Sequence, residues 1–216
     1  MPSRAVVLAL KSIQAADRLR LRWLAYRHPG LEVHPEASSN FAVARFLLAP
    51  GARLRLGPGA VTNRVPGACV FLIEAGAEVD LGPGTWLRTE LEPVRIAAYQ
   101  GARIVTGPDC LLNGCHVSAK QEVRMGRGVW VGLGSRVFDS DQHDLDDTHP
   151  LRTEPVHLGD HVWIASDSTV SRGVSIGEHS IVGARSLVTH DVPPHTLVYG
   201  QPARPRGSVG DRSRAR

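Results

Sequence analysis

Aliphatic side chains recur every six residues in the C-terminal part of this 216-residue chain, and this period restricts the possible folds more than any other feature. An α-helix would give a period of 3.6 and a simple strand a period of two. A period of six fits a short strand followed by a tight bend. Three such hexads would form one triangular coil of about 18 residues, stacked on its neighbours at ~4.8 Å. The aliphatic series is Leu158, Ile164, Val170, Ile176, Val182 and Val188, and small residues follow its first five members: Gly159, Ala165, Ser171, Gly177 and Gly183.

The same phase extends upstream, although less regularly. Met125, Val131 and Val137 continue it, and a weaker set follows the same spacing at Thr106, Leu112 and Ser118. Glycine turns form a parallel row at Gly57, Gly82, Gly107, Gly126, Gly159 and Gly177. The wider gaps in this row predict loops of about seven extra residues in the early coils, after Val61 and Arg88. One coil carries an insertion of about 15 residues between Val137 and Leu158.

The sequence therefore predicts an all-β fold, a parallel β-helix over residues 31–200 with a loop inserted near 138–157. An ordinary β-sandwich is the alternative, but it would lack the row of stacked glycine turns. Residues 1–30 form a predicted helical segment, with Val6, Leu10, Ile13 and Leu24 on one side. We expect this helix to cap the open end of the coil stack. A helix lying on a membrane surface is the alternative. Residues 201–216 form a basic C-terminal tail, which we expect to be disordered beyond residue 205.

Composition limits the setting of the protein. No apolar run approaches the ~20 residues needed to span a bilayer, and no secretory signal is evident, so we expect a cytoplasmic protein. Cys69, Cys110 and Cys115 are an odd count without paired spacing and are expected to be free thiols. The net charge of +4 comes partly from arginines at both ends of the chain. Without a nucleic-acid-binding motif, these arginines are interpreted as solvated or phosphate-binding, and no nucleic-acid partner is expected.

Three stretches resemble the hexapeptide-repeat acyltransferases, most closely the branch of galactoside, maltose and polysaccharide O-acetyltransferases. They are "MGRGVWVGLGSRV" at 125–137, "SDQH" at 140–143 and the segment 156–206 with "VWI" and "VPPHTLVYGQPAR". The resemblance implies a left-handed β-helix and a homotrimer with active sites between subunits. It also implies acetyl-CoA as co-substrate and no metal. The implied reaction is acetyl transfer to a hydroxyl or amine of a sugar, glycan precursor or similar small polar acceptor, as in polysaccharide biosynthesis.

Acyl transfer from a thioester needs a base that removes the proton of the acceptor, and an imidazole suits this role near neutral pH. His143 occupies the position of the catalytic histidine in the D-x-H loop of the family, so it is the predicted general base. Asp141 is the candidate to orient it. His149, six residues further along the same loop, is the competing candidate for the base.

The resemblance also implies which residues bind the two substrates. Ser166 and Ala184 would lie along the pantetheine arm of CoA, and Thr189 and His190 match a Thr-Lys pair in which the lysine is replaced. Arg204 is the predicted phosphate ligand, and Arg206 is the candidate to replace a second arginine that is Gly207 here. Asn113 lies near the substrate asparagine of the family, and His116 lies in the coil before the insertion and could line the same cleft.

One alternative mechanism and two alternative functions remain open from the sequence. Cys110 or Cys115 could act as the nucleophile of a ping-pong reaction, although neither has an activating neighbour in the sequence. A γ-class carbonic anhydrase would hold zinc on three histidines, and here His143 and His149 are the relevant pair. A scaffold without catalytic activity is the third alternative.

Overall fold

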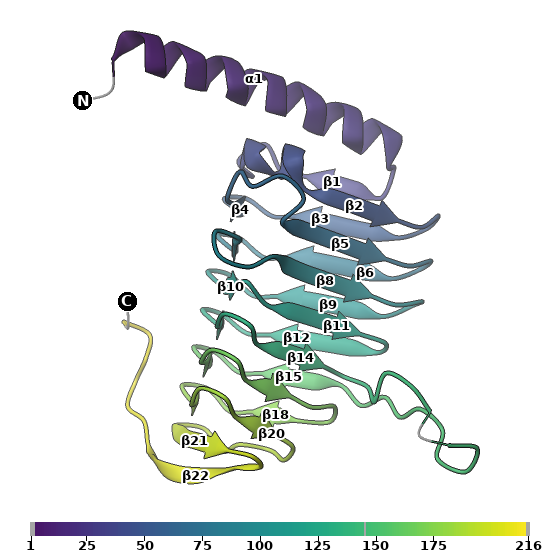
Figure 1. Ribbon diagram of the computed structural model, residues 1–216, viewed down its shortest axis with the longest axis vertical. Coiled ribbons are helices and arrows are strands. Elements are labelled where there is room, and N and C mark those ends of the chain that lie inside the picture. The colour runs from purple at the N-terminus through teal and green to yellow at the C-terminus, as the bar shows by residue number, and fades with distance from the viewer. Residues whose placement is uncertain (1–2, 145, 215–216) are drawn as a thin grey trace.

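Short parallel strands stacked in three columns form most of the molecule, which the computed structural model describes over residues 3–144 and 146–214 (Figure 1). Each turn of the chain contributes a strand to a first sheet (face A), then to a second (face C) and then to a third (face B). It then returns to face A one level further along the stack. The corners between these faces are named by the faces they join, in chain order: A–C, C–B and B–A. This architecture confirms the parallel β-helix prediction and excludes the sandwich.

The strands are two to six residues long. Face A contains β1 (Leu31–Val33), β3 (Arg53–Leu56), β6 (Glu78–Leu81), β9 (Arg103–Thr106), β12 (Glu122–Met125), β15 (Val156–Leu158) and β18 (Ser175–Ile176). Face B contains β2 (Arg45–Leu48), β5 (Cys69–Ile73), β8 (Val94–Ala98), β11 (His116–Ala119), β14 (Arg136–Phe138), β17 (Thr169–Val170) and β20 (Leu187–Val188). Face C contains β4 (Val61–Thr62), β7 (Trp86–Arg88), β10 (Leu111–Asn113), β13 (Trp130–Val131), β16 (Trp163–Ile164), β19 (Ile181–Val182), β21 (Thr196–Gly200) and the antiparallel β22 (Ala203–Ser208).

The aliphatic residues of the six-residue series fill the interior of the stack. Each of them is at most 3% exposed, as are Met125, Val131 and Val137 upstream. Fully burying one such side chain stabilises a fold by about 1.5–3 kcal/mol, so this aliphatic series is the main source of stability.

The prediction for the weaker upstream set is wrong at one position. Val117 pairs with Val137 in the interior, whereas Ser118 pairs with Phe138 on the outer side, because the corner before β11 is one residue shorter than expected.

The predicted glycine row lies where consecutive coils come closest together. A Cβ atom on Gly107 would lie 2.6 Å from the carbonyl carbon of Gly126, and one on Gly82 would lie 2.5 Å from the carbonyl oxygen of Thr106. Separations below 3.0 Å do not occur between such atoms in folded proteins, so only glycine permits this stacking distance.

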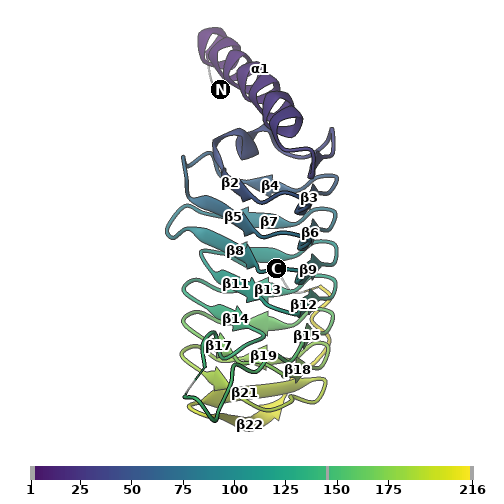
Figure 2. The ribbon, with the colours of Figure 1, turned by 90° about the vertical axis from the view of Figure 1, so that its right-hand side faces the viewer.

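The N-terminal helix α1 (Arg4–Arg27) lies across the end of the stack, with its N-terminal half extending past the coils (Figures 1 and 2). It begins after Ser3, whose side-chain oxygen accepts a hydrogen bond from the backbone N–H of Val6. The C-terminal half packs on β1 and on the short 3-10 helix η1 (Ser39–Val43), with Leu21 buried. Asp17 is buried there and forms a two-bond ion pair with Arg64, at 2.7 and 3.1 Å. The helix therefore caps the end of the stack, as expected.

None of the helices in the described part of the chain has the length and apolar character needed to cross a membrane.

The tail beyond residue 205 is ordered, which corrects the expectation of disorder for the described residues up to Arg214. Strand β22 pairs with β21, and the chain then turns back along the A–C corner. There the backbone N–H of Val209 donates to the carbonyl of His195 at 2.7 Å. The imidazoles of His161, His179 and His195 stack at this corner with ring centres 5.1 and 4.8 Å apart, and they form the surface on which the tail lies.

Arg212 holds the end of the tail in place. Its guanidinium lies over the rings of Trp130 and Trp163, and its backbone N–H donates to Nδ1 of His179 at 3.0 Å. Composition alone predicted disorder for the tail. Its order depends on the contact of Arg212 with two tryptophans of face C, which are paired in register but lie far from Arg212 in the sequence.

Candidate functional site

The inserted loop leaves the stack after β14 and returns at β15, so it occupies residues 139–155 and projects from the B–A corner (Figure 1). Its first residue is fixed from inside the stack. The buried carboxylate of Asp139 accepts hydrogen bonds from the backbone N–H groups of Lys120 and Gln121, at 2.8 and 2.6 Å. Burial raises the pKa of this carboxyl, although the amide hydrogen bonds act in the opposite direction. Asp139 thus attaches the base of the loop to the preceding turn.

An arginine of the next coil closes the base of the loop. Nε of Arg172 donates to Asp141 at 2.7 Å, and Nη1 donates to Glu154 at 2.6 Å. Asp141 lies on the outgoing arm and Glu154 on the returning arm. The backbone N–H of Glu154 also donates to the carbonyl of Asp139 at 2.8 Å. We call Asp141, Glu154 and Arg172 the loop clamp; because one guanidinium holds both arms, it fixes their separation.

The residue before the predicted base is held against face B. Gln142 adopts a left-handed backbone conformation, with φ of +69°. Its side-chain amide donates to Ser140 at 2.7 Å and to Ser118 of β11 at 3.4 Å, while its carbonyl accepts from Nζ of Lys120 at 2.7 Å. His143 follows directly and is exposed. Within the described residues it makes no hydrogen bond, so the Asp141–His143 pairing stays a prediction, and Asp141 binds Arg172 instead.

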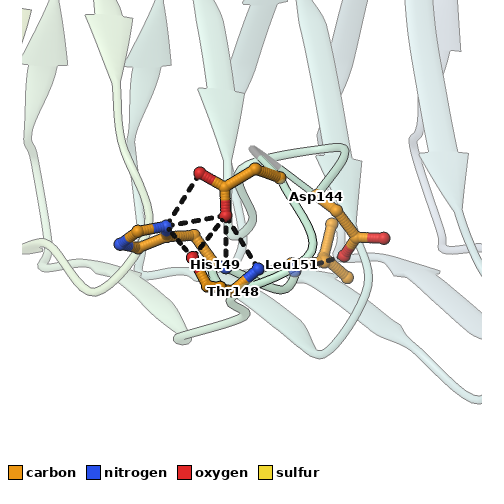
Figure 3. Close-up of polar contacts among 5 residues, drawn as sticks. Asp144, Thr148, His149 and Leu151 are labelled. Atoms are coloured by element: carbon orange, nitrogen blue, oxygen red, sulfur yellow. Dashed lines mark hydrogen bonds and ion pairs between the residues drawn. The ribbon is translucent and has the colours of Figure 1, made fainter.

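The competing histidine is part of a turn at the tip of the loop (Figure 3). Nδ1 of His149 lies 2.8 and 2.9 Å from the two carboxylate oxygens of Asp146, which also accepts from the backbone N–H groups of Thr148 and His149. The hydrogen bonds from Thr148 and His149 lower the pKa of Asp146 to about 2. The backbone N–H of Leu151 donates to Asp144 at 2.6 Å. His149 thus stabilises the tip, whereas the imidazole of His143 makes no comparable contact within the described residues.

Face B supplies a second histidine beside the loop. His116 of β11 lies two residues before Ser118 and so points to the same outer side, where the ring of Phe138 meets it edge to face at 5.2 Å. The strand register places His116 between Arg95 of β8 and Arg136 of β14. Burial, followed by these two guanidinium charges, lowers the pKa of His116 below its ordinary value. A neutral imidazole therefore faces the start of the loop.

The predicted pantetheine residues meet at the C–B corner. The backbone N–H of Arg185 donates to the carbonyl of Ser166 at 2.9 Å, which places Ala184 directly one coil below Ser166. Asn113 ends β10 at the same corner two coils higher. Above it lie the two early loops predicted after Val61 and Arg88, at residues 63–68 and 89–93.

The remaining predicted cofactor residues are divided between two places. The turn before Arg204 reaches the C–B corner, since the side chain of Gln201 donates to the carbonyl of Arg185 at 2.9 Å. Arg206 stacks over the ring of Tyr199 at 5.1 Å and so has a local packing role. Thr189 and His190 follow β20 at the B–A corner, one coil below Arg172, with 2.9 Å between Thr189 Oγ1 and His190 Nδ1. The outer side of face B thus lies between the predicted cofactor residues at the C–B corner and those at the B–A corner.

Cysteine nucleophiles have no support in this geometry. Cys110 and Cys115 are buried, and burial raises the pKa of each thiol to about 12. A thiolate is the reactive form, so neither residue is suited to a ping-pong reaction at neutral pH. Among residues 3–144 and 146–214, no three His, Cys, Asp or Glu side chains are grouped to hold a metal ion.

A groove of about 830 Å³ runs along face A, lined among others by Arg124, Arg127 and His157. It contains none of the residues predicted for acetyl transfer.

The sequence analysis did not predict the residues that hold the loop, namely Lys120, Asp139, Gln142 and Arg172. The acidic residues at both ends of the loop could have signalled a cationic partner, but nothing in the sequence identifies Arg172 among the arginines.

Comparison with known proteins agrees with the coil architecture. Residues 155–190 match the family model for the bacterial transferase hexapeptide (six repeats). Galactoside O-acetyltransferase of Escherichia coli (strain K12) is 36% identical over 72 residues, which are 33% of this chain and 36% of that protein. A Staphylococcus aureus (strain COL) protein with an acetyltransferase name is 32% identical over 105 residues, covering 38% of this chain and 53% of its own length. The chain thus spans about half or less of these relatives.

The crystal structure of the polySia specific acetyltransferase NeuO superimposes with a TM-score of 0.60 at 18% identity, covering 86% of this chain and 79% of that one. Together with the matched repeats, this likeness confirms the left-handed β-helix and the hexapeptide-repeat resemblance.

The environment of His116 gives a direct test of the electrostatics of face B. The imidazole should titrate below 6.5, and Arg95→Gln should raise its pKa because one repelling cation is removed. At pH values between the lowered pKa of the folded protein and 6.5, the unfolded chain binds the proton more readily than the folded chain. The free energy of unfolding should therefore decrease as pH falls from 6.5 through the folded pKa. NMR titration of the ring proton measures the pKa, and a midpoint at or above 6.5 would contradict the arrangement.

Proposed function

We propose that this hexapeptide-repeat left-handed β-helix is an acetyl-CoA-dependent acetyltransferase with His143 as general base. The observation that carries the proposal is the clamped loop. It holds an imidazole without a hydrogen-bond partner in the described chain directly after Gln142, whose side chain contacts Ser118 of face B. The anchor at Asp139 and the clamp at Arg172 fix both ends of this loop. Residues matching CoA contacts in related enzymes lie at the two corners that border the same face.

The proposed reaction is a direct transfer between two bound substrates. His143 removes the proton from the acceptor hydroxyl or amine, whose oxygen or nitrogen attacks the thioester carbonyl of acetyl-CoA. Collapse of the tetrahedral intermediate breaks the carbon–sulfur bond and expels the CoA thiolate, which takes the proton from His143. Backbone N–H groups or polar side chains must stabilise the oxyanion formed in between. No cysteine is needed, in agreement with the raised pKa values of Cys110 and Cys115.

The cofactor is proposed to run along the C–B corner. Ser166 and Ala184 are small residues, so the pantetheine arm could approach the backbone closely there. Arg204, at the lower end of this corner, is the proposed phosphate ligand, with Arg206, Thr189 and His190 as further contacts. We further propose a homotrimer in which a neighbouring subunit completes each site, because the inserted loop projects away from its own stack (Figure 1).

The acceptor is proposed to be a sugar, glycan precursor or similar small polar molecule, and its hydroxyl is the favoured site. The name of the Escherichia coli relative, a galactoside O-acetyltransferase, supports this class. Asn113 and His116 are the proposed acceptor contacts, and the adjoining loops supply further polar groups. In those loops, Asn63 donates to Glu90 at 3.0 Å and Arg88 to Glu90 at 2.8 Å. Polysaccharide biosynthesis in the cytoplasm is the proposed setting.

Replacing the base should separate chemistry from binding. His143→Ala should lower the acetyl-transfer rate about 100-fold or more, because general-base catalysis contributes roughly that factor, while CoA affinity stays the same. A thiol-release assay over sugars, nucleotide sugars and aminoglycoside-like acceptors measures the rate, and calorimetry measures CoA binding. His149→Ala is the matched control and should keep its activity. Full activity in His143→Ala would overturn the assignment.

The loop clamp predicts a positioning role for Arg172. Without it the two arms of the loop lose their shared partner, so Arg172→Ala should lower kcat about tenfold and leave the KM for acetyl-CoA within about twofold. Arg172→Lys, which keeps one charge but not the two-armed contact, should recover part of the loss.

Arg103→Ala removes a more exposed arginine on face A, 3.9 Å from Glu122, and serves as the control. Thermal unfolding separates positioning from general stability. The positioning role of Arg172 would be contradicted if Arg172→Ala retained full kcat, or if its loss of kcat only paralleled a lower unfolding temperature.

A further inference from the structure

The side of α1 that faces away from the coil stack carries large apolar side chains. Leu8, Leu19, Trp23 and Tyr26 are 65%, 64%, 54% and 84% exposed. Together with Ala15 they follow one another at intervals of three, four or seven residues, which keeps them on one side of an α-helix. We call these five residues the outer stripe. Exposed Ser12 lies on the same side between Leu8 and Ala15, so the apolar surface is continuous only from Ala15 to Tyr26. An exposed apolar surface of this kind on a helix indicates a contact partner.

The outer stripe is separate from the side that docks α1 on the stack. Docking uses Asp17, Leu21 and Leu24, spaced by four and three residues, and the ion pair of Asp17 with Arg64 fixes that orientation. Val6, Leu10 and Ile13 extend this docking side toward the N-terminus. The outer stripe therefore cannot reach the coils of its own chain. The helix α1 that carries it lies across the end of the stack (Figures 1 and 2).

Basic residues border the outer stripe on both sides. Arg4, Lys11 and Arg22 flank it along one edge, and Arg20 and Arg27 flank it along the other. The guanidinium of Arg27 lies 5.3 Å from the ring centre of Trp23, so charge and aromatic surface are contiguous. The acidic residue of α1 within the described chain, Asp17, is buried and paired with Arg64. The surface is thus cationic at its edges and apolar at its centre.

We infer that the outer stripe of α1 binds an anionic lipid surface. The apolar centre would enter the boundary between headgroups and acyl chains, where tryptophan and tyrosine are favoured, while the flanking arginines and lysine contact phosphate groups. A second copy of this chain fits less well, because pairing two outer stripes would bring two sets of like charges together. The inference does not depend on the proposed acetyl transfer. It places the stack upright on the membrane, with the inserted loop toward the other end.

Sedimentation of the full-length protein with vesicles tests this surface. The protein should bind vesicles of phosphatidylcholine mixed with phosphatidylglycerol, should not bind phosphatidylcholine alone, and should be partly released by salt. Leu19→Ser/Trp23→Ser should abolish binding. Arg20→Glu/Arg22→Glu should weaken it about tenfold or more, since each basic residue near an anionic surface contributes about 1 kcal/mol.

A matched control variant makes the same change of charge at a different place on the molecule. Arg45→Glu/Arg95→Glu reverses two exposed arginines on face B and should bind the vesicles like the unchanged protein. All four substituted positions of α1 are exposed, so thermal unfolding should be unaffected. Three results would overturn the inference: no binding to the anionic vesicles, equal loss of binding in the face B control, or a smaller assembly in solution for Leu19→Ser/Trp23→Ser. The last result would identify the outer stripe as a contact between copies.

Discussion

Stacking of consecutive coils is the constraint on which the rest of the molecule depends. Backbone hydrogen bonds join each strand to the strand one level above and below, so every coil must keep the same cross-section. Two-residue strands place one side chain in the interior, such as Ile164 of β16, and longer strands place two or three, such as Leu54 and Leu56 of β3. Glycine is required where backbones come closest, as at Gly82 and Gly107. Any residue added to a coil must leave the stack at a corner. Functional loops can therefore arise only at the corners, and their positions are rigidly defined.

The inserted loop uses this rigidity at both ends. Asp139 fixes its start to the turn at Lys120, and Arg172 joins its two arms from the coil below. Only the tip, organised by Asp146, lies away from the stack. His143 lies between these fixed and projecting parts, so its backbone is anchored through Gln142, while its imidazole makes no hydrogen bond within the described residues. Such an arrangement is compatible with the proposed role of His143 as general base and with the proposed homotrimer.

The sequence predicted the periodic parts of the structure because one residue type recurs wherever the geometry recurs. Leu158 through Val188, the glycine row and the loop boundaries all follow from spacing. Features that depend on contacts between distant segments were not predictable in the same way. Ser118 was assigned to the interior because a corner one residue shorter shifts the phase. The tail was expected to be disordered because its contacts, from Arg212 to two tryptophans and from Val209 to His195, join segments far apart in the chain. The Arg172 clamp escaped detection for the same reason.

We propose that the C–B corner and the clamped loop together bind the thioester substrate. Hydrogen–deuterium exchange of the protein with and without CoA tests this claim most directly, because amide groups along the whole stack are measured at once. We expect CoA binding to slow exchange at residues 165–168, 183–186 and 200–204, together with the loop 139–155. Slower exchange confined to the face A groove around Arg124, Arg127 and His157 would contradict it.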